Sequence, residues 1–111
     1  MILKKINRSW TVGSDRDIII TEKLKIQLND DEQVSFIGNK NNTNYEICKK
    51  NWGYYISPSL NKRLKNYGLR VYITKNKKGQ NYLMAVKFKM VKEFKLYCKK
   101  EKLKFKLLKL I

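Results

Sequence analysis

The sequence predicts an α+β fold, in which an antiparallel β-rich N-terminal half precedes a helix, a β-hairpin, a second helix and a strand. Three observations support this fold class. Short apolar runs separated by polar turn clusters fill residues 1–56. Residues 57–111 then open with a Ser-Pro helix start, followed by apolar residues at helical spacing. A glycine turn next separates two strand-like segments. The chain has 111 residues, so we expect a single domain over residues 1–111.

The first half is predicted to be mostly β. LKIQL alternates apolar and polar side chains, which is the pattern of a half-buried strand. NDDEQ and GNKNNTN favour hairpin turns, because Asn and Gly tolerate left-handed backbone and Asp bonds its own backbone. The close spacing of the segments is typical of a small antiparallel sheet or barrel. The expected strands are residues 9–13, 17–22, 24–28, 33–38, 44–49 and 52–56.

A helix is predicted over residues 58–67. Ser57 offers a capping hydroxyl, and Pro58 suits the first helical position. Apolar side chains follow at i, i+4 and i+7, and a glycine stands where the helix should end. These residues are Leu60, Leu64, Tyr67 and Gly68.

A hairpin across residues 69–89 follows, with Gly79 in its turn. Residues 90–101 predict the second helix, because three side chains share one helical stripe. That stripe consists of Val91, Phe94 and Cys98. In residues 103–111, the alternation of LKFKL favours a strand, and a continuous helix over residues 90–111 is the alternative.

Positive charge is the main functional signal. The chain carries 26 Lys plus Arg against 9 Asp plus Glu, a net charge of +17. Residues 1–55 hold 9 basic and 7 acidic side chains, whereas residues 56–111 hold 17 and 2. Such an imbalance repels itself in the folded state unless a polyanion, or simply salt, compensates it. Among anionic partners, nucleic acid comes first, followed by an anionic membrane surface and an acidic protein.

The alternating strands predict where that charge gathers. If Leu69, Val71 and Ile73 face the core, the open face of a shared three-stranded sheet carries lysines, an arginine and a tyrosine. Such a face suits single-stranded nucleic acid, because cations follow phosphates and a ring stacks on a base. Lysines on a sheet face also keep it solvated, which is the alternative. The candidate binding residues are Arg70, Tyr72, Lys87, Lys89, Lys104 and Lys106.

The stretch NWGYYISPSL divides between core and surface. Strand parity places Trp52 and Tyr54 in the core with Leu64 of the following helix, and leaves Tyr55 exposed as a further candidate binding residue. Ser57 and Ser59 stand at the predicted helix start, where free backbone N–H groups could hold an anion.

Catalysis is poorly supported by the sequence. The chain has no His, the usual general base and the commonest metal ligand. The carboxylates of Asp30, Asp31 and Glu32 suggest solvated turn residues, with a divalent-metal site as the alternative. We therefore expect a non-enzymatic binding protein of low sequence selectivity, without a cofactor.

No secretory signal or membrane span is recognised in the sequence, so we expect a cytoplasmic protein. Cys48 and Cys98 lie far apart without CxxC spacing, which favours two reduced thiols, and one disulfide is the alternative.

The run WGYYISPSLNKRLKNYGLRVYI resembles small uncharacterised bacterial proteins with a W-G-Y-Y-x-[ST]-P-S-[LI] stretch. The resemblance covers residues 52 to about 105. That family has no assigned activity, and some members lie beside surface-polysaccharide biosynthesis genes. The resemblance implies an accessory or interaction protein for an enzyme complex as the alternative function, and it assigns no site residues.

Overall fold

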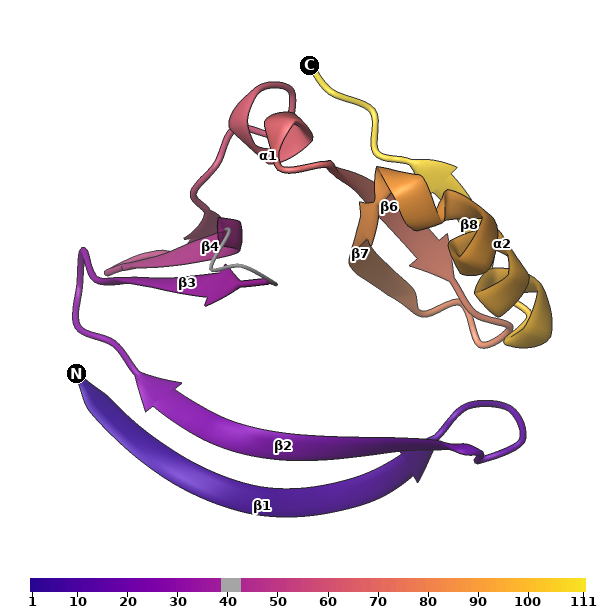
Figure 1. The fold of residues 1–111 in the computed structure, drawn as a ribbon, viewed down its shortest axis with the longest axis horizontal. Coiled ribbons are helices and arrows are strands. Elements are labelled where there is room, and N and C mark those ends of the chain that lie inside the picture. Colours follow the sequence, from indigo (N-terminus) through magenta and orange to yellow (C-terminus); the bar gives the residue numbers. More distant parts are fainter. Residues whose placement is uncertain (39–42) are drawn as a thin grey trace. The chain divides into compact units, whose positions relative to one another are not determined.

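The computed structural model describes residues 1–38 and 43–111. The protein has a β-rich α+β fold with two short helices (Figure 1). Its elements in chain order are β1 (Ile2–Val12), β2 (Ile18–Gln27), β3 (Gln33–Ile37), β4 (Thr43–Lys50), β5 (Gly53–Ile56), α1 (Arg63–Asn66), β6 (Leu69–Lys75), β7 (Asn81–Lys87), a 3₁₀ turn (Phe88–Met90), α2 (Val91–Lys100) and β8 (Lys104–Leu107). The chain divides into two compact units. The first comprises Met1–Val34 and Ile47–Tyr55, and the second comprises Ser35–Glu46 and Ile56–Ile111.

In the first unit, β1 and β2 form one long antiparallel hairpin with an irregularity between Lys5 and Arg8. The prediction of separate strands at residues 17–22 and 24–28 is wrong, because β2 runs through both. The charged residue between them is held across the hairpin. The Lys23 ammonium donates to the Asn7 side-chain oxygen at 3.1 Å, which ties the two strands together at the irregularity, where Lys23 itself has no paired partner.

The NDDEQ segment is a turn, but the prediction that it closes a hairpin is wrong. It joins β2 to β3, which belong to different sheets. The Asn29 N–H donates to a Glu32 carboxylate oxygen at 2.7 Å, and the Glu32 N–H donates to the Asn29 carbonyl at 3.2 Å. These two hydrogen bonds satisfy backbone groups within the turn itself. The turn therefore does not need a paired strand, and the chain continues from β2 into the next sheet. Most of the second predicted turn, GNKNNTN, lies outside the described residues.

The three-stranded sheet β3-β4-β5 shows why the core prediction for Trp52 and Tyr54 is wrong. Trp52 sits in the two-residue turn between β4 and β5, ahead of the strand, and is 68% exposed. Tyr54 lies on β5, a four-residue edge strand, and is 65% exposed. Strand parity places a ring in the core only where a covering element lies on that face.

The second unit contains the sheet β7-β6-β8, so the three predicted strands do share one sheet. The Gly79 turn is confirmed: the Gly79 N–H donates to the Asn76 carbonyl at 3.0 Å, and the glycine has a φ of +82°. Strand β7 ends at Lys87, earlier than expected, because Phe88–Met90 tighten into a 3₁₀ turn before α2. The helix prediction for residues 90–101 is confirmed by α2. Residues 104–107 form a strand, so the alternative of a continuous helix is wrong.

Helix α1 begins five residues later than predicted. The Ser57 N–H donates to the Glu46 carbonyl at 3.0 Å, so the backbone just before Pro58 is still hydrogen-bonded to β4. Pro58 is fully buried there. Ser59 organises the helix start instead, since its carbonyl accepts from the Leu64 N–H at 3.0 Å. A strand contact therefore overrides the local helix signal.

Two small apolar clusters lie on opposite faces of the β7-β6-β8 sheet. On one face, Leu64 of α1 packs against Leu69 and Val71 of β6, and all three are buried. This confirms the core prediction for Leu64. The half-buried residues packed against them are Tyr45, Leu60, Tyr67 and Leu108. On the other face, α2 lies beside the strands (Figure 1) and places Phe94 against Phe105, with ring centroids 5.6 Å apart.

Cys98 of α2 is 1% exposed, and burial raises the pKa of its thiol. Cys48 of β4 is also buried, and both thiols are free, as the sequence predicts. Within the described residues, no helix has the length and apolar character needed to span a membrane.

Candidate nucleic-acid interface

Strand register assigns the residues of the β7-β6-β8 sheet to its two faces, because directly paired residues in antiparallel strands point the same way. Leu69, Val71, Ile73 and Lys75 of β6 share one face. Their partners on that face are Lys87, Ala85, Leu83 and Asn81 of β7, and Lys106 and Lys104 of β8. Helix α1 covers the Leu69 and Val71 end of this face.

The predicted face of β6 is therefore wrong for Tyr72 and Arg70. Tyr72 pairs with Met84 and Leu107 on the face that α2 covers. Its half-buried ring lies 5.0 Å from the Phe94 ring, between centroids, so it is not an exposed stacking platform. Arg70 also lies on this second face, where its guanidinium donates to two backbone carbonyl groups.

Lys87, Lys104 and Lys106 do share the open face, as predicted, and Lys75 joins them. We call these four residues the lysine face. All four are exposed. Lys89 is not a member, because it lies in the 3₁₀ turn beyond the end of β7. The sequence analysis missed Lys75, which the hairpin turn places opposite Asn81.

Within the lysine face, Lys75 and Lys104 stand directly opposite each other on neighbouring strands. Like charges at directly opposed positions destabilise a sheet. Residues 56–111 contain only two carboxylates, those of Glu93 and Glu101, on α2 and at its C-terminal cap. Neither belongs to the three strands, so the face carries four positive charges and no negative one.

The positive charge continues into a hollow of about 470 Å³ at the tip of the β6–β7 hairpin. Its charged lining is entirely lysine: Lys75, Lys77, Lys78, Lys102 and Lys104. Asn76 shapes the turn, because its side-chain oxygen accepts from the N–H groups of Lys78 and Gln80 at 3.0 and 2.9 Å. The hollow and the lysine face share Lys75 and Lys104.

Apolar side chains lie between the lysines. Leu83 is 62% exposed and Ile73 is half-buried on the same face. A second hollow, of about 330 Å³, includes Ile73 with Lys104 and Lys106. Near Lys87, a shallow depression includes the Tyr45 ring, whose hydroxyl pKa is raised by burial. An aromatic ring thus borders this face, supplied by β4 rather than by Tyr72.

The remaining predicted site residues lie elsewhere. Tyr55, in the first unit, is exposed as predicted; it stacks on Trp52, and a hydrogen bond with the Cys48 thiol raises its hydroxyl pKa. The helix start predicted to hold an anion at Ser57 and Ser59 lies elsewhere, because α1 begins at Arg63 and the Ser57 N–H donates to the Glu46 carbonyl. The Ser57 hydroxyl is buried without a hydrogen-bond partner, and the Ser59 hydroxyl accepts from the Arg63 N–H at 3.2 Å.

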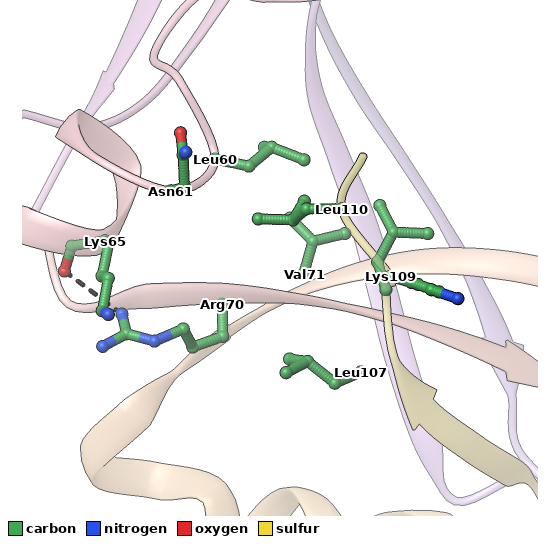
Figure 2. Close-up of a pocket in the computed structure, with 9 residues that line it drawn as sticks. Leu60, Asn61, Lys65, Arg70, Val71, Leu107, Lys109 and Leu110 are labelled. Atoms are coloured by element: carbon green, nitrogen blue, oxygen red, sulfur yellow. Dashed lines mark hydrogen bonds between the residues drawn. The ribbon is translucent and has the colours of Figure 1, made fainter.

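A separate groove of about 490 Å³ runs between α1, the start of β6 and the chain after β8 (Figure 2). Its aliphatic lining consists of Leu60, Val71, Leu107, Leu108 and Leu110. Arg70 and Lys65 lie at one end, where the Arg70 guanidinium donates to the Lys65 carbonyl at 3.2 Å. Lys109 lies at the other end, with its ammonium pointing away.

The turn carboxylates are paired with cationic groups. Asp30 pairs with the Lys49 ammonium at 2.7 Å, Asp31 pairs with Lys50, and Glu32 lies 3.7 Å from the N-terminal amine of Met1. These pairings raise the pKa of both lysines. Across residues 1–38 and 43–111, no group of three His, Cys, Asp or Glu side chains is placed to hold a metal ion.

Comparison of the chain with protein-family models, with curated proteins and with solved structures gives no match.

Proposed function

We propose that the chain is a small, non-enzymatic binding protein for single-stranded nucleic acid, which it contacts through the lysine face. The observation that carries this proposal is the opposed pair of Lys75 and Lys104 on a sheet face without a carboxylate. The repulsion between them favours a bound polyanion, whose phosphates would neutralise both ammonium groups.

The spacing of the lysine face suits an extended strand. Lys87 and Lys75 lie near opposite ends of the β6–β7 hairpin, six strand residues apart in register, or roughly 20 Å along the sheet. Leu83 and Ile73 lie between these ends. A single strand can lay its unstacked bases against these apolar side chains, whereas a duplex presents mainly phosphates.

The proposal also predicts low sequence selectivity. Lysine is a point charge on a flexible stem, whereas bidentate recognition of a base edge is typical of arginine. The one arginine among the predicted residues, Arg70, points to the other side of the sheet from the lysine face. Phosphate contacts should therefore dominate the affinity.

The test is binding of a mixed-sequence oligonucleotide across a salt series. Four neutralised phosphates give a slope of log K against log salt of about −3, at about −0.7 per contact on a single strand. Lys87→Gln with Lys106→Gln should flatten the slope by about 1.4. The matched control is Lys92→Gln with Lys95→Gln on α2, which removes the same charge at exposed positions outside the sheet.

Equal weakening by the two double variants would contradict a defined face and leave only diffuse attraction to a basic protein. No binding at about 50 mM salt would favour an acidic protein partner instead. Leu83→Asn should weaken binding to the single strand more than binding to a duplex of the same length. Equal losses would contradict the contact between bases and apolar side chains.

A further inference from the structure

The groove beside α1 combines an apolar floor with a cationic end. All five of its aliphatic side chains come from the second unit, and its lining contains no acidic residue. Its volume of about 490 Å³ falls within the range of small-molecule sites. Such a lining suits a ligand with an apolar chain and a negatively charged head.

Arg70 is held in place at the cationic end. Its Nη1 donates to the Lys65 and Leu69 carbonyl oxygens at 3.2 and 2.9 Å, and its guanidinium carbon lies 4.9 Å from the Phe88 ring centroid. These three groups hold the guanidinium in place. None of them is an anion, so they do not neutralise the positive charge of Arg70. Its fork also matches the geometry of a carboxylate.

The other end of the groove is formed by the chain that follows β8. The Leu108 N–H donates to the Val71 carbonyl at 3.0 Å, which fixes this segment against the centre of the sheet. Beyond it, Leu110 is 47% exposed and still lines the groove. An apolar chain lying here would cover aliphatic surface that water now contacts.

We propose that this groove binds a single-chain amphiphilic carboxylate of the fatty-acid class, with its head on Arg70 and Lys65 and its chain along Leu60, Val71 and Leu110. Val71 belongs to the same sheet face as the lysine face, but none of the four lysines lines the groove. Arg70 points to the other side of the sheet from Lys75, Lys87, Lys104 and Lys106.

The test uses the full chain and sodium decanoate below its micelle-forming concentration, measured by titration calorimetry. Decyltrimethylammonium is the matched probe with the same chain and the opposite charge. We expect one decanoate per chain and at least tenfold weaker binding of the cation. Octanoate should bind about 15-fold more weakly than decanoate, at roughly fourfold per methylene removed.

Arg70→Gln should weaken decanoate binding about tenfold or more while leaving oligonucleotide binding unchanged. Leu110→Asp provides a second test, because this exposed residue is not part of the buried cluster and its replacement should preserve the fold. Lys99→Gln is the control, because this exposed lysine of α2 does not line the groove. Circular dichroism verifies the fold of each variant.

Equal affinity for the anionic and cationic amphiphiles would overturn the assignment of the head group. Unchanged decanoate binding in both Arg70→Gln and Leu110→Asp would overturn the site, as would the absence of binding to the unmodified chain. The oligonucleotide titration is independent of these outcomes. A failure of the groove proposal and a failure of the proposed nucleic-acid function are therefore distinguishable.

Discussion

Tyr72→Ala tests whether the ring of Tyr72 is part of the α2 cluster or stands on an open binding face. The ring contacts Phe94 and Phe105, with centroids 5.0 and 6.2 Å away. Each aromatic pair contributes about 0.5–1.5 kcal/mol beyond its buried area, so two pairs account for about 1–3 kcal/mol. Truncation of a core aromatic costs about 3–5 kcal/mol. Since Tyr72 is half-buried, we expect a loss of about 3 kcal/mol.

The assay is equilibrium urea unfolding followed by circular dichroism. The matched control is Tyr82→Ala, because Tyr82 lies on β7 of the same sheet and is 48% exposed. The control should cost less than about 1 kcal/mol. If Tyr72→Ala unfolds at the same urea concentration as the control, the α2 cluster is not a core and the face assignment from register fails. A double-mutant cycle with Phe94→Leu should give a coupling of about 0.5–1.5 kcal/mol.

Two further predictions concern buried polar groups. The Glu46 carboxylate is 6% exposed and lies 2.8 Å from the Arg63 guanidinium. Arg63→Gln removes this charge partner and should lower the free energy of unfolding by about 1–3 kcal/mol. Lys62→Gln is the urea-unfolding control, and equal losses would contradict the ion pair. Because burial raises the pKa of Cys98, an unfolded thiol ionises before a folded one as the pH rises. The stability that the buried neutral thiol contributes should therefore be complete below about pH 8 and decline toward pH 10. Urea midpoints measured across that range check this, and Cys98→Ala should not show the decline.

The sequence predicted elements well where one pattern dominated. The Gly79 turn, the helix stripe of α2 and the β8 strand were all recognised, because each rests on local chemistry. β8 alternates strictly between lysine and apolar residues, so its face assignment was right as well. Register then shows that Lys104 and Lys106 share the open face.

Strand β6 shows why the same reasoning failed for Tyr72. β6 is the central strand of the sheet, and helices pack on both of its faces: α1 over Leu69 and Val71, and α2 over Tyr72. Alternation cannot then identify one core face. The turn around Gly79 contains the missing information, because it fixes the register that pairs Tyr72 with Met84. Combining the turn with the β7 pattern would have placed Tyr72 on the apolar face.

The late start of α1 and the groove beside it could not be predicted from local patterns. Ser57 remains bonded to Glu46 of β4, a contact between residues distant in sequence. The groove likewise joins Leu60, Val71 and Leu110, which belong to three separate segments. Their juxtaposition depends on how β8 pairs with β6, and no periodicity within one segment encodes it.

The lysine face predicts an opposition between stability and binding at Lys104. Lys104→Glu replaces the repulsion with Lys75 by a cross-strand ion pair. Each of these two terms is roughly 0.2–1 kcal/mol, so the variant should be more stable by about 1 kcal/mol at low salt. The gain should vanish near 1 M salt, where the Debye length falls to about 3 Å. The same variant should bind the oligonucleotide more weakly, because it places a carboxylate among the phosphate contacts. Urea unfolding at two salt concentrations, beside the oligonucleotide titration, measures both effects. A variant that loses stability at low salt, or that binds as tightly as the unmodified chain, would show that the opposed lysines are ordinary surface residues and that the polyanion does not contact them.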